Sequence, residues 1–433
     1  MRLLNTNTLQ LFEFFDSSVP EYAILSHTWR EEEVSYQEWM TQATNEDLRR
    51  KKGYWKISKF CQLCREQGYA WTWIDTCCID KSSSAELSEA INSMYQWYKD
   101  ARLCYVYLVD VPASDYIESE GSKFSQSRWF SRGWTLQELI APESVHFYSK
   151  DWVKLGERVG ISRVLEKITG IEYRLLLRPV TIHDYSIARK MSWASKRTTS
   201  RKEDMAYCLL GIFDVNMPLL YGEGDKAFLR LQEEIIKVST DHTLFAWTIP
   251  EKNMQVNCGL LAPSPSFFVN ASHIMRQPTA VGKSAATLMK TLYSHEPYSM
   301  TNRGLRIELA LVRSWAFSAH VLDAGNLAPE TENQRVAILN CISAQAPGKI
   351  IAVHLEPIGI DVTGGDYGAE TYQRTKCDKL EYLDHDLAAQ CKFESIYLQR
   401  ESTIVHRVPV AMHFKGRVVD VFAAFAEAMK GTS

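Results

Sequence analysis

The sequence predicts an α/β domain with a parallel sheet, followed by a helical extension and a β-rich C-terminal domain. Up to residue 150, short apolar runs alternate with amphipathic helical patterns, and this alternation is typical of parallel sheets. From about residue 257 the pattern changes to alternating apolar and polar stretches separated by Gly, Pro, Asn and Asp, which favours antiparallel strands. We therefore expect three parts, which are residues 1–150, 151–256 and 257–433.

Four strands and one long helix are expected in the first part. The strands are YAILSHTW (22–29), WTWIDTCCID (71–80), CYVYLVDV (104–111) and VHFYS (145–149). After the second of them, SSAE (83–86) fits a capping box in which Ser83 is the N-cap. Apolar residues then recur at helical spacing and predict a core-facing helix face. They are Leu87, Ala90, Ile91, Met94, Tyr95 and Tyr98.

The segment SRWFSRGWTLQELIAP (127–142) concentrates aromatic and charged residues. Glu138 lies one helical turn after Trp134, so both side chains are expected on one helix face. An acid beside an aromatic residue, with Arg128 and Arg132 upstream, suits the binding of a sugar, a base and phosphates. The residues themselves leave one alternative open, in which Glu138 is an ordinary solvated helix residue.

The second part carries helical spacing in KEDMAYCLLGIFDV and GEGDKAFLRLQEEIIKVS, and it also holds a basic run at 189–204. That run is either a solvated surface or an anion-binding edge. In the third part we expect strands at 304–312, 335–342, 349–358 and 408–414. Their alternation predicts an antiparallel sandwich or barrel.

Composition narrows the classes of partner. The formal net charge is −3, so nucleic acid is not an expected partner. We expect no leader of the secretory type, and no apolar stretch reaches the ~20 residues that a membrane helix needs. Cys61 and Cys64 form a CxxC, but the adjacent Cys77 and Cys78 have poor geometry for the second ligand pair that a zinc site needs. We therefore expect mostly reduced thiols, no metal and a cytoplasmic protein.

Three of these segments resemble the signature blocks of the HET (heterokaryon incompatibility) domain of filamentous fungi. The blocks are YAILSHTW, WTWIDTCCIDKSSSAELSEAINSMYQWYKDA and SRWFSRGWTLQELIAP. The resemblance implies a cell-death effector that acts when incompatible strains fuse. The chain has neither a P-loop nor internal repeats, so we expect a sensor in the C-terminal domain or in a separate protein.

The order of elements also resembles a TIR domain, which has a flavodoxin-like parallel sheet. GWTLQEL (133–139) is similar to a TIR segment whose glutamate cleaves NAD⁺, and that glutamate corresponds to Glu138. The resemblance implies cleavage of the bond between ribose and nicotinamide, with NAD⁺ as substrate and no further cofactor. It also implies a homo-oligomer on activation.

Two carboxylates are the catalytic candidates. Glu138 would stabilise an oxocarbenium-like transition state, and Asp75 should follow the second strand, at the edge where open α/β sheets bind ligands. A cap or loop role stays open for Asp75. The substrate-binding candidates are Ser26, His27, Trp29, Asp80, Lys81, Arg128, Arg132 and Trp134. Two other functions are kept open, namely a non-catalytic death-signalling adaptor that associates homotypically and a hydrolase of another nucleotide.

Overall fold

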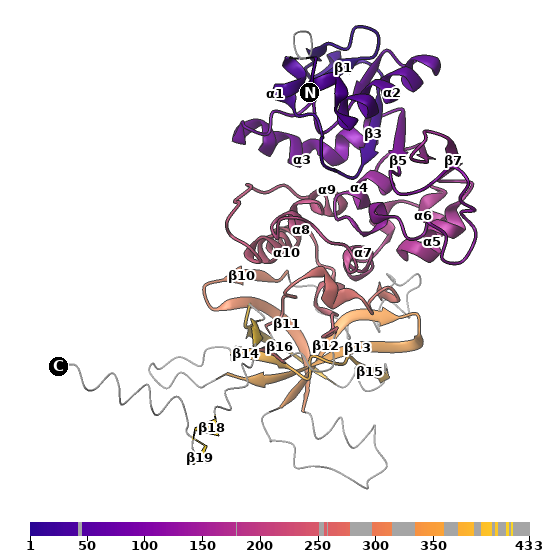
Figure 1. Cartoon of the computed structure of the whole chain (residues 1–433). Coiled ribbons are helices and arrows are strands. Elements are labelled where there is room, and N and C mark those ends of the chain that lie inside the picture. The colour runs from indigo at the N-terminus through magenta and orange to yellow at the C-terminus, as the bar shows by residue number, and fades with distance from the viewer. Residues whose placement is uncertain are drawn as a thin grey trace, which may run out of the picture.

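The computed structural model describes residues 1–41, 46–178, 180–250, 255–257, 259–277, 297–313, 334–358, 371–384, 391–400, 403–405, 413–414 and 417–418. Figure 1 shows two sheets with helices between them. The N-terminal sheet lies at the top, the helical extension lies in the middle and the C-terminal sheet lies below.

The first sheet contains the four predicted strands, and all four run parallel. They are β3 (Ala23–His27), β4 (Trp71–Trp73), β5 (Leu103–Tyr107) and β6 (Val145–Tyr148). In space they follow the order β4-β3-β5-β6. Every residue of β3 and of β5 is buried, as expected for strands of a sheet that is covered on both faces.

Three further strands extend this sheet on both edges. The hairpin of β1 (Arg2–Asn5) and β2 (Leu11–Glu13) pairs antiparallel with β4, and β7 (Lys154–Glu157) pairs antiparallel with β6. The sheet therefore continues past residue 150, where the sequence pattern predicts the helical extension. These strands are only three or four residues long, too short to show a period of two.

The helices of the first part are α1 (Tyr36–Met40), α2 (Lys52–Glu66), α3 (Ser84–Asp100) and α4 (Thr135–Ile140). Ser83 caps α3 as predicted, because its hydroxyl accepts a hydrogen bond from the Glu86 amide at 3.3 Å. The capping box is only half formed. The Glu86 carboxylate accepts bonds from Arg2 and from the Asp80 amide, both at 2.7 Å, instead of the cap amide. The predicted core face of α3 is confirmed, since Ala90, Ile91, Met94 and Tyr98 are buried.

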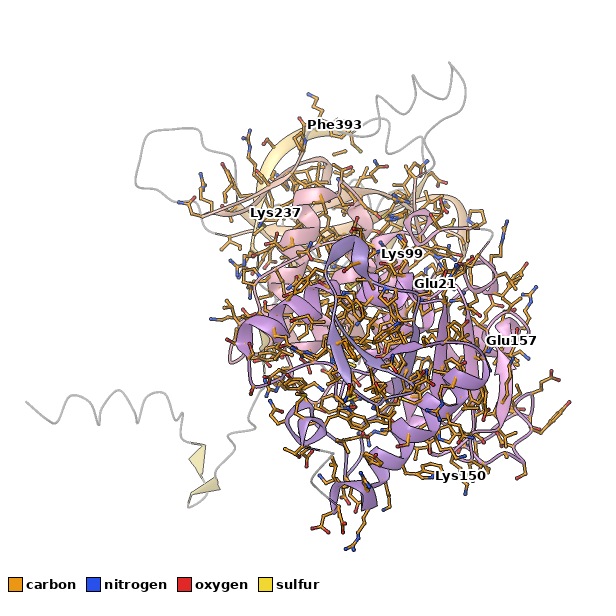
Figure 2. All side chains as sticks on the ribbon, turned by 90° about the horizontal axis from the view of Figure 1, so that it is seen from above. Glu21, Lys99, Lys150, Glu157, Lys237 and Phe393 are labelled. Carbon is orange, nitrogen blue, oxygen red and sulfur yellow. The ribbon has the colours of Figure 1, made fainter. Side chains whose placement is uncertain are left out.

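The extension after β7 is helical, as the spacing predicts. Its helices are α5 (Ser162–Thr169), α6 (Tyr173–Leu176), α7 (Ile187–Ala194), α8 (Asp204–Tyr207), α9 (Leu210–Phe213) and α10 (Lys226–Val238). Figure 2 shows the molecule from above, with side chains packed between the ribbons and the labelled residues Lys150 and Glu157 near the edge of the view.

The C-terminal sheet closes on itself. Its strands are β9 (Ile274–Arg276), β10 (Ser299–Thr301), β11 (Gly304–Arg313), β12 (Arg335–Ser343), β13 (Ala346–Pro357), β14 (Thr371–Thr375), β15 (Glu381–Asp384) and β16 (Lys392–Leu398). The order β11-β16-β14-β13-β12 returns to β11 through an additional pairing, which forms a barrel-like ring. One of its pairings, β14 with β16, is parallel.

Three of the four strands expected in this part are confirmed as β11, β12 and β13. The fourth, at 408–414, lies largely outside the described residues. A separate two-stranded ladder joins β8 (Gln255–Asn257) to β17 (Thr403–Val405), and another joins β18 (His413–Phe414) to β19 (Arg417–Val418).

The cysteines follow the expectation of mostly reduced thiols with one exception. Eight of the described cysteines form no disulfide, whereas Cys377 is disulfide-bonded. Cys61 and Cys64, the CxxC pair, are buried on α2. Over the part of the chain that the structure describes, no helix is both long and apolar enough to cross a membrane.

Candidate functional site

A pocket of about 330 Å³ opens beyond the carboxyl ends of β3 and β4, where open α/β sheets bind ligands. Helices α3 and α4 form two of its walls, and the segment 200–221 forms a third. Its lining residues are His27, Trp29, Asp75, Ile79, Lys81, Leu87, Ile91, Met94, Arg132, Trp134, Thr135, Glu138, Ser200, Arg201, Asp204 and Tyr221. The structure thus brings together seven of the ten sequence-predicted site residues.

Glu138 lies in this pocket on α4, a helix whose six residues are all buried. Its carboxylate accepts a hydrogen bond from the Ser26 hydroxyl at the end of β3, and that hydroxyl accepts one from the Trp129 indole at 2.8 Å. Burial raises the pKa of Glu138 to about 8; the charge of Asp75 adds to this rise, while Ser26, Arg132 and Arg197 oppose it. The sequence alternative, a solvated helix residue, is therefore wrong.

Asp75 and His27 also line the pocket and lie close to each other. The two atoms Asp75 Oδ1 and His27 Nε2 lie 3.7 Å apart, which is too long for a hydrogen bond. Neither ring nitrogen of His27 is hydrogen-bonded within the described part of the chain, and the Asp75 Oδ1 atom is not either. Burial, with the positive charges of Lys56, Lys81 and Arg132, holds the pKa of His27 well below its usual value. This shift favours the neutral form of His27, whose Nε2 atom also lies 3.9 Å from Glu33 Oε2.

Trp29 and Lys81 form the rim next to Asp75. The Trp29 indole donates a hydrogen bond to Asp75 Oδ2 at 2.7 Å, and the Lys81 ammonium lies 3.7 Å from the centre of the Trp29 ring. Burial lowers the pKa of Lys81, while Asp75 opposes that shift. Trp29 is still 41% exposed, although Lys81 lies over its ring.

Three predicted residues lie outside the lining. Ser26 acts one layer behind it, through its bond to Glu138. Arg128 is exposed on the short turn η3 (Arg128–Ser131), which directs the neighbouring Trp129 into the core, so Arg128 does not reach the pocket. The Asp80 carboxylate instead accepts bonds from Gln37 and from the Ser82 amide and hydroxyl, which hold it in its own loop.

Besides Thr135 on α4, four polar lining residues were missed from the sequence. They are Ser200, Arg201, Asp204 and Tyr221. The first three end the basic run at 189–204, so the anion-binding alternative for that run was the available signal. Burial raises the pKa of Asp204, and a hydrogen bond from the Tyr221 hydroxyl, at 3.0 Å, opposes the shift.

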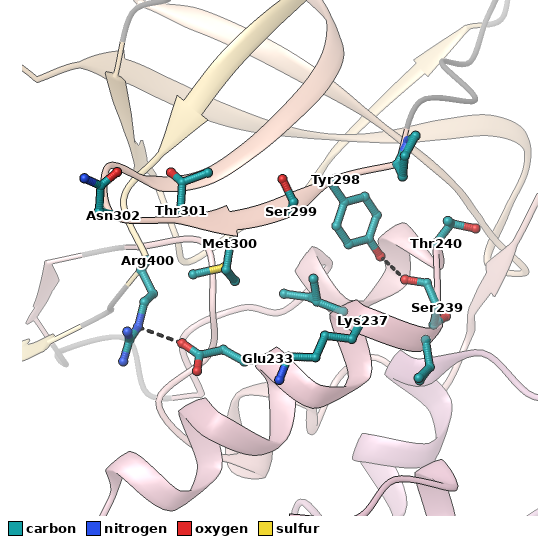
Figure 3. Close-up of a pocket in the computed structure, with 13 residues that line it drawn as sticks. Glu233, Lys237, Ser239, Thr240, Tyr298, Ser299, Met300, Thr301, Asn302 and Arg400 are labelled. Carbon is teal, nitrogen blue, oxygen red and sulfur yellow. Dashed lines mark hydrogen bonds and ion pairs between the residues drawn. The ribbon is translucent and has the colours of Figure 1, made fainter.

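A larger cavity of about 730 Å³ lies between α10 and β10 and shares no lining residue with this pocket (Figure 3). Two pairs of its polar groups are engaged with each other. Arg400 pairs with Glu233 at 2.9 Å, and the Tyr298 hydroxyl donates to the Ser239 carbonyl at 2.8 Å, as the dashed lines in Figure 3 show. The smaller pocket at the sheet edge is therefore the better candidate site. In the described ranges, no three His, Cys, Asp or Glu side chains gather as a metal site would require.

Comparison with known proteins assigns the first part to a family. Residues 22–121 match the family model of the heterokaryon incompatibility protein (HET). The chain carries a HET domain. This HET match contains His27, Trp29, Asp75 and Lys81, whereas Glu138 and the segment 200–221 lie beyond its end.

A curated relative extends the comparison. Over 229 residues the chain is 49% identical to the vegetative incompatibility protein HET-E-1 of Podospora anserina, which covers 51% of this chain. The matched region is 16% of the length of that protein, so the chain spans a small part of the relative it matches. No solved structure matches the chain.

Proposed function

We propose that this chain is a fungal cell-death effector of vegetative incompatibility, and that it acts by cleaving NAD⁺ at the bond between nicotinamide and ribose. The HET domain and the name of the matched relative support the incompatibility role. The enzymatic step rests on the pocket at the edge of the parallel sheet.

The observation that carries this proposal is Glu138. A buried carboxyl whose pKa rises to about 8, in a cleft lined by aromatic and cationic residues, is the kind of group that active sites hold. The strand order β4-β3-β5-β6 equals second-first-third-fourth along the chain, the order of flavodoxin-like sheets. That order supports the resemblance to TIR domains.

The residues of the pocket suit the chemistry of NAD⁺ cleavage. When the bond breaks, its electron pair goes to the nicotinamide nitrogen, which leaves neutral, and the ribose becomes oxocarbenium-like. An ionised Glu138 stabilises that positive charge in a site of low dielectric. Water then adds its oxygen to the ribose carbon and releases one proton. Asp75, which has an unpaired buried oxygen, is the nearest candidate to orient that water.

Binding of NAD⁺ would itself prepare Glu138 for this role. The nicotinamide ring of NAD⁺ carries a positive charge, and an opposite charge nearby favours the ionised form of a carboxyl. The pocket volume of about 330 Å³ lies at the lower end of small-molecule sites, which span about 300–1,000 Å³. It therefore accommodates the nicotinamide riboside half, with the phosphates at the rim.

The test compares nicotinamide release from NAD⁺ by the full chain and by Glu138→Gln, each at several protein concentrations, because assembly is expected to activate the chain. We expect Glu138→Gln to lower the rate about 100-fold to 1,000-fold. Glu89→Gln is a matched control, since Glu89 is exposed on α3 and does not line the pocket.

Two results would replace the proposal. If the wild-type chain releases no nicotinamide, yet kills a fungal host and Glu138→Gln kills equally well, the chain is an adaptor that acts by association. If it instead degrades another nucleotide in a Glu138-dependent way, the site is a hydrolase of that nucleotide.

A further inference from the structure

The segment 197–204 is joined to the pocket by backbone pairing. The Thr198 amide donates to the Ser131 carbonyl at 2.7 Å, and the Gly133 amide donates to the Thr198 carbonyl at 2.9 Å. Arg132 and Thr198 form an isolated parallel bridge between these two bonds. The pairing sets the helical extension directly against the loop that leads into α4.

A buried arginine reinforces this contact. Arg197 is only 5% exposed. Its guanidinium donates hydrogen bonds to the Arg132 carbonyl at 2.8 Å and to the Thr135 hydroxyl at 2.9 Å. The Arg132 side chain in turn donates to the Ser200 hydroxyl at 3.4 Å. The backbones of Arg132 and of residues 198–200 are therefore held together at one rim of the pocket.

This arrangement adds a second cation, Arg201, to the lining of the pocket. The Arg201 guanidinium lies over the Tyr221 ring, 4.4 Å from its centre, and the Tyr221 hydroxyl is fixed by its bond to Asp204. Arg201 and Arg132 both line the pocket, whereas Arg128, the sequence-predicted second arginine, does not. Two guanidinium groups in the lining of one pocket suit the binding of phosphate oxygens, which arginine contacts through two parallel N–H donors.

We infer that Arg201, supplied by the helical extension, acts with Arg132 to bind the phosphates of a nucleotide, and that the site selects phosphorylated nucleotides over free nucleosides. The inference deepens the proposed function and rests on the same pocket. It means that the HET domain matched at 22–121 does not hold the whole site. The extension supplies the residue that determines which substrates enter.

The test measures binding rather than turnover, so that it stands apart from NAD⁺ cleavage. ADP and adenosine, neither of which carries nicotinamide, are titrated by calorimetry into the full chain and into Arg201→Ala. We expect Arg201→Ala to weaken ADP binding about tenfold or more, because a charge-assisted bond is lost, and to leave adenosine binding unchanged. Raising the salt concentration should weaken ADP binding less in the variant than in the wild type.

Lys202→Ala is the matched control, because the neighbouring Lys202 pairs with Asp225 at 2.9 Å and does not line the pocket. It should bind ADP as the wild type does. The inference is overturned if Arg201→Ala binds ADP like the wild type, if it loses adenosine equally, or if the wild type binds no ADP. A chain that binds ADP through Arg201 but releases no nicotinamide would overturn only the proposed function.

Discussion

At the residue scale, the environment of Glu138 decides its charge. A carboxyl with a pKa of about 8 is mostly protonated at neutral pH in the empty pocket, and it ionises as the pH rises through that value. The bond from Ser26 favours the ionised form and keeps the pKa from rising further. Catalysis by the carboxylate would therefore be limited by ionisation at neutral pH and below.

We predict that kcat/KM for nicotinamide release rises about tenfold per pH unit up to about pH 8 and then levels off, because kcat/KM reports the free enzyme. The corresponding rise in kcat should occur at lower pH, because the positive charge of bound NAD⁺ lowers the pKa of Glu138. Ser26→Ala should shift the rise in kcat/KM to higher pH, because it removes a hydrogen bond that lowers the pKa of Glu138. Stopped assays from pH 5.5 to 9.5 measure both limbs.

The control for this profile is Glu89→Gln, whose limbs should coincide with those of the wild type. A rate that stays level from pH 6 to pH 9 in the wild type would show that ionisation of Glu138 does not limit the reaction.

At the element scale, the pairing of the loop before α4 with the segment 198–199 requires the two segments to lie very close together at Gly133. A Cβ atom at Gly133 would lie 2.5 Å from Thr199 Cγ2 and 3.0 Å from Cys208 Sγ, distances that require the neighbours to move. The glycine is therefore needed for the two segments to pair, and the pairing holds Arg132 and Arg201 at one rim of the pocket.

We predict that Gly133→Ala lowers the free energy of unfolding by about 1–3 kcal/mol through overpacking, and raises KM for NAD⁺ because the rim is displaced. Urea denaturation and steady-state kinetics measure the two effects.

The double variant Gly133→Ala with Thr199→Ser removes the methyl group that clashes, and it should recover part of both losses. Thr199→Ser alone keeps the hydroxyl that bonds to the Arg201 carbonyl and should stay close to the wild type. Equal losses in the single and double variants would mean that the contact at Thr199 is not the cause.

At the scale of the whole molecule, the two sheets share one apolar core. A single cluster of buried residues includes Ile24 of the first sheet, Leu231 of α10 and Leu309 of β11. At the junction, the buried Arg374 of β14 donates to the carbonyls of Phe245, at 3.1 Å, and Trp247, at 2.6 Å. Its guanidinium lies 4.1 Å from the centre of the Trp247 ring.

We predict that Trp247→Ala destabilises both sheets together and lowers the free energy of unfolding by about 3–5 kcal/mol. The substitution removes a fully buried ring and leaves Arg374 without its stacking partner. Hydrogen exchange followed by mass spectrometry should show a loss of protection in β3 and β5 as well as in β12 and β13. Trp55→Ala, at an exposed position on α2, is the control and should change neither. Faster exchange confined to the C-terminal strands would show that the two sheets unfold independently.

Local patterns in the sequence determined much of the fold. Apolar runs predicted β3, β4, β5 and β6, and helical spacing predicted α3 with its Ser83 cap, because both depend on residues near one another in the chain. The same local rule placed Trp134 and Glu138 in one pocket. The two edge strands beside β4 and the ring closure of the C-terminal sheet were not predictable in this way, since they depend on pairing between distant segments.

The site itself was decided by tertiary structure. Sequence placed Asp75 and His27 at the ends of strands, but only the parallel register brought them within 3.7 Å of each other. Arg201 lines the pocket, and the predicted Arg128 does not, because the segment 197–204 packs against the loop before α4. The raised pKa of Glu138 was not predictable from the sequence either. Desolvation depends on all the groups that surround a side chain in the folded protein, whereas a sequence pattern shows only its neighbours along the chain.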